Sequence, residues 1–192
     1  MMKHRGLFGV AMVILLSLLL SGCAADFGGK TSPGVNPAAT PNSKTVSPPK
    51  TVPVATVPVK VYFGTHDAKY IVAEVQQLQN DSQLMKRAME ALAAGPKNSN
   101  LVAVVPKATQ VRSVVLKEKT AFVDFSSEIA KRGFGGSATE ILAVGAIVNT
   151  LTEFPGVEQV QILVEGKKVD TLYGHLDVYD AMSRSPAIIK GK

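Results

Sequence analysis

The chain has 192 residues, a formal net charge of +6 at pH 7 and 46% hydrophobic residues. Its basic residues are spread along the sequence and are not interleaved with aromatic side chains, which argues against nucleic acid as a partner. Because Cys23 is the only cysteine, an intramolecular disulfide is excluded, and a folded domain has to depend on its hydrophobic core.

Residues 1–22 have the pattern of an export signal. Lys3 and Arg5 precede an apolar run of about 14 residues, which is shorter than the roughly 20 residues of a membrane-spanning helix. The run ends in Leu20-Ser21-Gly22-Cys23, which resembles the lipobox of bacterial lipoproteins. We therefore predict a cleaved signal peptide and a lipidated Cys23, with palmitate among its acyl chains, on the extracytoplasmic face of a bacterial membrane. A structural cysteine after an ordinary signal, or an uncleaved anchor, is the alternative.

Residues 23–58 are rich in proline. Seven of the eleven prolines of the chain fall here, among Thr, Ser, Asn, Val and Ala, and Phe27 is the only aromatic residue. Such a segment buries too little apolar surface to offset the entropy lost on ordering. It predicts a disordered tether of about 35 residues that holds a folded domain away from the lipid. A proline-rich recognition sequence is the alternative.

The first elements of the folded part are a hairpin and a helix. Residues 59–63 and 70–75 are two β-branched and aromatic runs on either side of a polar turn. After a candidate N-cap at Asp81-Ser82, apolar residues recur at intervals of three and four from Leu84, which predicts a helix. Gly95-Pro96 is expected to end it, because Pro cannot continue a helix.

A second unit of the same type follows. Residues 112–116 and 120–125 flank a short charged turn and predict another hairpin. Ser137 and Glu140 have the spacing of a capping box, which predicts the start of a helix that runs to Phe154. Pro155-Gly156 is expected to end this helix.

Residues 157–164 and 169–173 predict a closing hairpin. The expected order is β-β-α-β-β-α-β-β, with two helices on a mostly antiparallel sheet. The fold class is therefore α+β, as a two-layer sandwich. The domain is expected to span residues 59–186, with a disordered tail at 187–192.

Two groups of residues are candidates for chemistry. His66 and His175, each near an aspartate, are a zinc pair only if the fold brings them together, and polar surface turns are the simpler interpretation. Ser126-Ser127-Glu128 follows a predicted strand, where a turn or the cap of a short helix explains it without catalysis.

Two further features have the residue types of known sites but the wrong spacing. Glu140 and Glu153 lie about 20 Å apart along one helix, whereas the two carboxyl groups of a glycosidase need about 5–10 Å. The stretch from Gly133 to Gly136 lacks the Lys-Ser/Thr of a phosphate loop and is interpreted as a flexible connector. We expect no enzyme activity, no metal site and no cofactor.

Several segments, in order, resemble the GerMN domain of bacterial sporulation and germination lipoproteins. The match extends over about residues 59–180. The segments that carry it are Val61-Tyr62-Phe63, Tyr70-Ile71-Val72 with Glu74, residues 91–97, residues 106–109, residues 121–126, and the most specific, Ala146 to Val157 continuing through residues 160–166. Tandem copies are known in this family, whereas this chain has one.

The resemblance implies a fold related to ring-building modules, which act by packing side by side, and it brings no catalytic residues. The predicted function is a membrane-anchored interaction or assembly module of the bacterial cell envelope, in sporulation or germination. Its expected partners are membrane lipid through the anchor, and envelope proteins or further copies of itself. A peptidoglycan or wall-polymer binder is the alternative. Asn149 and Thr150, polar residues late in an apolar helix, are either bonded to nearby backbone or part of an interaction surface.

Overall fold

The fold is taken from a computed structural model, in which residues 55–131 and 134–191 are described. The predicted signal peptide, Cys23 and the tether up to residue 54 lie outside the described residues.

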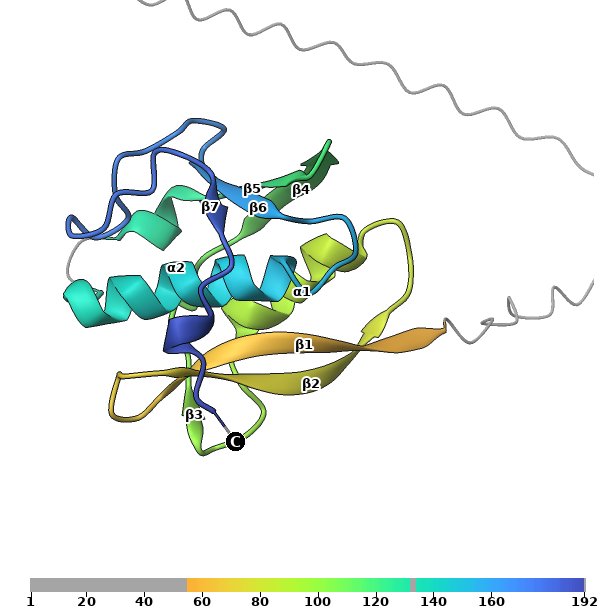
Figure 1. The fold of residues 1–192 in the computed structure, drawn as a ribbon, viewed down its shortest axis with the longest axis horizontal. Helices are drawn as coiled ribbons and strands as arrows, with labels where there is room; N and C mark the ends of the chain where they lie inside the picture. The colour runs from red at the N-terminus through yellow and green to blue at the C-terminus, as the bar shows by residue number, and fades with distance from the viewer. Residues whose placement is uncertain (1–54, 132–133, 192) are drawn as a thin grey trace, which may run out of the picture. The chain divides into compact units, whose positions relative to one another are not determined.

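The strands form two separate sheets. The first has the order β2-β1-β3 and the second the order β4-β5-β6-β7. Their bounds are β1 Thr56–Thr65, β2 Ile71–Gln79, β3 Leu101–Val102, β4 Val111–Lys117, β5 Thr120–Phe125, β6 Gln159–Val164 and β7 Met182–Ser183. Two helices, α1 (Leu84–Ala94) and α2 (Ser137–Leu151), lie between the sheets (Figure 1). The α+β class is confirmed, but the strands that were predicted as one sheet are divided between two.

The first predicted hairpin is confirmed and is longer than expected. β1 and β2 are antiparallel, with Val61 opposite Glu74, and β1 starts at Thr56, three residues before the predicted domain boundary at Val59. Val61 and Phe63 are fully buried because they face the helices. These first strand residues were predicted as part of the tether because the segment is rich in proline.

Helix α1 ends where predicted, but its N-cap is Gln83 and not the predicted Asp81-Ser82. Asp81 Oδ1 accepts the Gln83 N–H at 2.8 Å, and its other carboxylate oxygen pairs with Arg87. The helix starts at Leu84 and ends before Gly95, whose φ of 94° is in the left-handed region that glycine adopts most easily.

The second sheet is mixed. β4 and β5 form the predicted antiparallel hairpin, whereas β5 and β6 are parallel, joined by a crossover that contains α2. The predicted closing hairpin is wrong, because residues 169–173 form no strand and β7 pairs with β6 instead. The backbone N–H groups of Leu172 and Tyr173 are bonded to Glu140 and not to the edge of β6.

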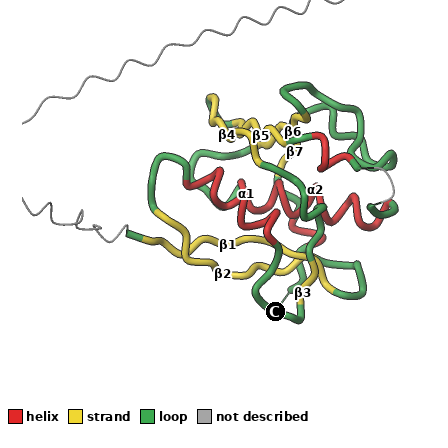
Figure 2. Tube along the Cα trace, turned by 180° about the vertical axis from the view of Figure 1, so that it is seen from behind, coloured by secondary structure: helices red, strands yellow, loops and turns green. Residues whose placement is uncertain are grey.

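Most of α2 is buried, since both sheets and α1 pack around it (Figure 2). Its apolar residues are the centre of the core, with β1, β5 and β6 supplying the facing side chains. The fully buried side chains with the largest volumes are Phe63, Phe125, Ile71, Met89, Leu92, Ile129, Ile147, Leu151 and Ile162.

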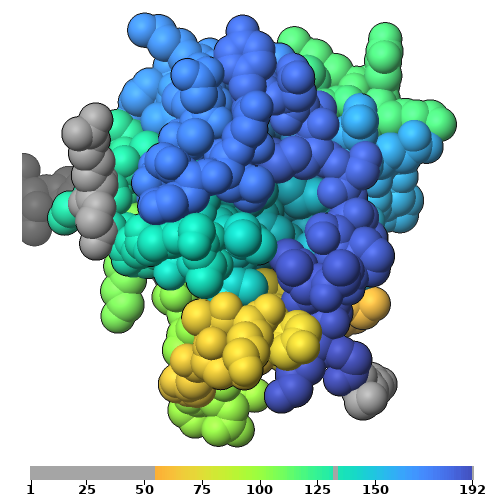
Figure 3. All heavy atoms as spheres, turned by 60° about the vertical axis from the view of Figure 1, so that its left-hand side comes forward, coloured from red at the N-terminus to blue at the C-terminus, as the bar shows by residue number. Residues whose placement is uncertain are grey.

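Residues 182–191 form what we call the C-terminal strap. At one end β7 pairs with β6 of the second sheet, and at the other the Lys190 N–H donates to Ile71 O of the first sheet at 2.9 Å. Between them lies a short 3-10 helix, η2 (Pro186–Ile188). In Figure 3 this dark-blue segment lies beside the blue-green α2 and reaches the yellow residues of β2. The prediction of a disordered tail is therefore wrong for residues 187–191.

Candidate functional site

Glu140 is a fully buried carboxylate near the start of α2. Its Oε1 accepts the N–H groups of Leu172 at 2.8 Å and Tyr173 at 2.7 Å. Its Oε2 accepts those of His175 at 2.7 Å and Leu176 at 3.1 Å. One side chain therefore fixes the whole turn from 172 to 176 against the helix.

The predicted capping box is wrong. Helix α2 begins at Ser137 with Gly136 as its N-cap, and no side chain caps it. Glu140 is thus the fourth residue of the helix, and its partners are 32 to 36 residues away in the sequence. A spacing of three residues favoured a local bond, but the distant loop supplies four donors to the same carboxylate.

The four N–H groups keep the Glu140 carboxylate ionised in its buried position. Burial alone raises the pKa of this carboxyl, but the donors of residues 173, 175, 172 and 176 outweigh it and hold the pKa below its usual value. The His175 ring also lies close, with Nδ1 3.2 Å from Glu140 Oε2. Burial and the Glu140 charge together raise the pKa of Tyr173.

A second polar cluster lies just beyond the other end of α2. Glu153 Oε1 accepts the Tyr62 hydroxyl at 2.8 Å and Arg184 Nη2 at 2.6 Å, while Oε2 accepts Lys60 Nζ at 3.0 Å. Arg184 Nη1 donates in addition to Asn149 O at 3.0 Å. Burial raises the pKa of Glu153, but these donors outweigh it and the net shift is downward. The cluster connects β1, α2 and the C-terminal strap.

Asn149 and Thr150 are fully buried and form no surface of the domain. Thr150 Oγ1 accepts the Tyr62 N–H at 3.0 Å, and Asn149 Nδ2 donates to Gly145 O at 2.8 Å. The hypothesis of an interaction surface at these residues is therefore wrong, and the alternative of bonds to nearby backbone holds, with the partner of Thr150 near in space but 88 residues away in the sequence. Thr150 satisfies a donor on the edge of β1 that β2 does not reach.

The remaining candidates are not brought together. His66 Nε2 lies 3.2 Å from Ser99 O in an exposed turn, whereas His175 lies beside Glu140. Within residues 55–131 and 134–191, no three His, Cys, Asp or Glu side chains form a group that could hold a metal.

The carboxylates and the serines also have separate, structural roles. Glu140 and Glu153 belong to the two different clusters described above, as their spacing predicts. Ser126 Oγ accepts the Gln110 N–H at 3.0 Å, and Ser126 precedes the short 3-10 helix η1 (Ser127–Ala130), which confirms the prediction of a short helix there. The glycine-rich connector begins at Gly133, which lies outside the described residues.

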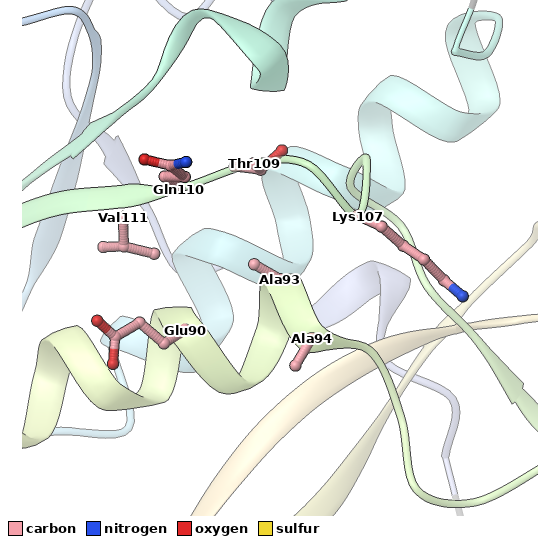
Figure 4. Close-up of a pocket in the computed structure, with 7 residues that line it drawn as sticks. All are labelled: Glu90, Ala93, Ala94, Lys107, Thr109, Gln110 and Val111. Carbon is pink, nitrogen blue, oxygen red and sulfur yellow. The ribbon is translucent and has the colours of Figure 1, made fainter.

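A shallow groove of about 380 Å³ lies between α1 and residues 107–111. Figure 4 shows Glu90 and Lys107 at its opposite ends, with Ala93 and Ala94 along the helix between them. Thr109 also lines it and is buried, with a hydroxyl that has no partner among the described residues. The groove is therefore lined by charged and polar side chains at its rim and by alanines of α1 between them.

Tyr62 and Arg184 are the residues that sequence reasoning missed. Tyr62 stands in an ordinary strand pattern, where an aromatic residue is expected in any case. Arg184 lies between two serines near the predicted tail, and no motif marks it. Their role is visible only in the structure, where the Arg184 guanidinium donates to the Tyr62 hydroxyl at 2.7 Å across 122 residues of sequence.

The chain is similar to the spore germination protein GerM of Bacillus subtilis (strain 168), to which it is 26% identical over 93% of this chain and 55% of that protein. The chain thus spans about half the length of that relative. Within the described residues, neither helix is long and apolar enough to cross a membrane.

The fold is also similar to solved structures, among them one from Bacillus subtilis and one from Clostridium perfringens. The first GerMN domain of the sporulation protein GerM from Bacillus subtilis has a TM-score of 0.59 and 27% identity, over 67% of this chain and 98% of that one. A protein from Clostridium perfringens, described provisionally as a lipoprotein, has a TM-score of 0.50 and 26% identity, over 68% of this chain and 89% of that one.

The family comparison covers most of the described domain. The model of the Germane family, described as "Sporulation and spore germination", matches residues 60–170. That range contains both helices, most of β1, strands β2 to β6 and Glu140 itself, and it ends just before the loop of residues 172–176 that Glu140 holds. The chain therefore belongs to the Germane family of sporulation and spore germination.

Proposed function

We propose that this protein is a lipid-anchored interaction and assembly module on the extracytoplasmic face of a bacterial membrane, acting in sporulation or germination without catalysis of its own. The observation that carries the proposal is the use of the polar side chains inside the domain. Glu140, Glu153 and Arg184 are each bonded to two or more groups that hold the fold together.

The surface offers contact points instead. Val75 on β2, Val115 on β4 and Tyr179 after β6 are 61%, 46% and 49% exposed. Val75 and Val115 lie on different sheets, whereas Tyr179 lies in the loop between β6 and β7. A strand at the edge of a sheet also presents unpaired backbone groups, which are a template for pairing with another chain.

The sequence ahead of the domain supports anchoring. Cys23 ends a lipobox-like segment, and a lipid with two or more acyl chains holds a protein stably at a membrane, whereas a single chain does not. The provisional description of the Clostridium perfringens relative as a lipoprotein agrees with this.

The test is carried out with the full chain in cells. We expect Cys23→Ala to move the protein out of the membrane fraction while the domain stays folded, because Cys23 lies outside the described domain. Amine-reactive crosslinking of the wild type is expected to capture further copies or an envelope protein. A Cys23→Ala variant that stays in the membrane contradicts the anchor. A wild-type chain that forms no crosslinks contradicts the assembly module.

A second candidate function is binding of a cell-wall polymer in the groove beside α1. Its supporting observation is the polar lining, with Glu90, Lys107, Thr109 and Gln110 around a floor of alanines. Hydroxyl and amide groups of a glycan can hydrogen-bond to such side chains. Cosedimentation of the full chain with purified sacculi, lost in the Glu90→Ala/Lys107→Ala variant and retained in Val75→Ala, is the expected result. Equal cosedimentation of both variants rules out the groove.

A further inference from the structure

We propose that the outer edge of β2 is a self-association site, where residues 73–77 pair antiparallel with the same residues of a second copy. This inference rests on the proposed function, because it names the surface through which an assembly module meets its partner.

The direction of the backbone groups follows from two hydrogen bonds. The Tyr62 N–H leaves the sheet on the side away from β2 and donates to Thr150 Oγ1. Tyr62 pairs with Ala73, so these two residues form a pair without hydrogen bonds between β1 and β2. The N–H and C=O groups of Ala73, and of every second residue after it, therefore point away from β1.

The C-terminal strap confirms this alternation. Ile71, two residues before Ala73, points its carbonyl outward and accepts the Lys190 N–H at 2.9 Å. Ala73, Val75 and Gln77 have the same orientation and are exposed. Among the described residues, none donates to or accepts from the outward backbone groups of these three.

This edge lacks the features that keep other edges from pairing. Residues 71–79 contain no Lys, Arg or Pro, and the strand runs in unbroken register with β1. Its one charged residue, Glu74, faces the other side and accepts the backbone N–H groups of Lys97 and Asn98. A regular edge strand without basic residues or proline is a template for another strand.

The edge of the second sheet is protected in contrast. β4 has an irregular register between Val111 and Ser113, and it carries Arg112 and Lys117. Bulges and basic side chains are the usual means by which proteins block edge pairing. Val115 on β4 is nevertheless 46% exposed, which makes it a matched control for Val75.

The β2 sequence is complementary to itself. In antiparallel pairing centred on Val75, Val75 lies opposite Val75, Ala73 opposite Gln77 and Glu74 opposite Gln76, so no two like charges face each other. The outward groups of residues 73, 75 and 77 then pair with one another. The span 73–77 leaves the contact between Ile71 and Lys190 in place. A two-fold arrangement of this type is the commonest symmetry of homo-oligomers.

The first test is disulfide trapping in cells with the full chain carrying Val75→Cys. Directly opposite residues of a hydrogen-bonded antiparallel pair have Cα atoms about 5.5 Å apart, which is within the range for a disulfide. We expect a disulfide-linked dimer for Val75→Cys. The parent chain and Val115→Cys, treated with the same oxidant, are expected to stay monomeric on non-reducing gels. Equal dimer formation by Val75→Cys and Val115→Cys, or none by either, overturns the assignment.

The second test is a charge exchange with the full chain purified in detergent. Val75→Lys and Val75→Glu each place like charges opposite each other in the dimer, so each alone is expected to associate at least tenfold more weakly than wild type. A mixture of the two is expected to regain association, because Lys then faces Glu. The side chain is exposed, so neither variant disturbs the core. No loss in the single variants, or no recovery in the mixture, contradicts pairing through β2.

The outcomes separate this inference from the proposed function. In one outcome, the wild type crosslinks to further copies or to an envelope protein, and the Val75 variants behave like the wild type. This outcome supports the assembly module and contradicts β2 as its site. If no assay detects association, both the assembly module and the β2 site are contradicted.

Discussion

Ile188 of the C-terminal strap lies directly on the backbone of Gly145 in the middle of α2. A Cβ atom at Gly145 would overlap Ile188 Cδ1, so any other residue at this position requires the end of the Ile188 side chain to move. The same side chain lines a small apolar groove with Val144 and Val148.

This contact predicts coupled effects of substitution at the two positions. In an Ile188→Ala background, Gly145→Ala is expected to raise the free energy of unfolding by about 1 kcal/mol, because Ala favours a helix over Gly by that amount. In the wild-type background the gain is expected to disappear, because Ile188 has to move. Urea unfolding of the four proteins in a double-mutant cycle measures the difference. The same gain in both backgrounds would show that the contact is not tight.

The buried Glu140 predicts a pH-dependent stability. Its pKa is lower in the folded than in the unfolded chain, so its contribution is complete above the unfolded pKa of about 4.3 and is lost as the pH falls below it. The free energy of unfolding is therefore expected to decrease as the pH falls from about 5 to 3, and Glu140→Gln is expected to flatten this dependence. It is also expected to cost about 2–4 kcal/mol at pH 7, since an amide donor then faces backbone donors.

The matched control for Glu140 is Glu90→Gln on α1. Glu90 is exposed and pairs only with Lys86 at 3.2 Å in the described structure. Its substitution is expected to leave the pH profile almost as in wild type. Chemical denaturation at several pH values measures both variants, and equal profiles for the two would contradict the role of Glu140.

Thr150 predicts a specific loss when its hydroxyl is removed. Thr150→Val leaves the Tyr62 N–H buried without a partner, which is expected to lower the free energy of unfolding by about 1–3 kcal/mol. Thr150→Ser keeps the acceptor and is expected to preserve the protection of the Tyr62 amide against hydrogen exchange. If the Val and Ser variants exchange this amide at the same rate, the hydroxyl is not its partner.

The hydrogen bonds of Arg184 are expected to protect the C-terminal strap from local opening. Arg184→Met keeps the alkyl stem but removes the bonds to Asn149 O, Glu153 and the Tyr62 hydroxyl. We expect faster hydrogen exchange at Lys190, whose N–H bonds to Ile71 O at the far end of the strap. Amides of β5, which the strap does not contact through Arg184, serve as the internal reference. Unchanged exchange at Lys190 would show that β7 and Ile188 hold the strap without Arg184.

Local features were predictable where neighbouring residues decide them. Gly95 ends α1 because its own backbone adopts a positive φ, and the β4–β5 hairpin forms across a turn of two residues. The capping box at Ser137 and Glu140 shows where this reasoning ends. The spacing allows a local bond, but four donors from residues 172–176 compete for the same carboxylate, and a short window of sequence does not contain them.

The sequence by itself determined the presence of the two helices, the end of α1 before Gly95, the β1–β2 and β4–β5 hairpins and the membership of the family, and it predicts the lipid anchor at Cys23. Helix α2 ends at Leu151 and not at the predicted Phe154. The tertiary structure decided the division of the strands into two sheets, the burial of Asn149 and Thr150, and the position of the strap. The physical reason is the range of the interactions. Turns and helix ends depend on adjacent residues. A polar side chain in an apolar helix, in contrast, can be buried only where a partner reaches it. For Thr150 that partner is the Tyr62 N–H, which is more than 80 residues away in the sequence.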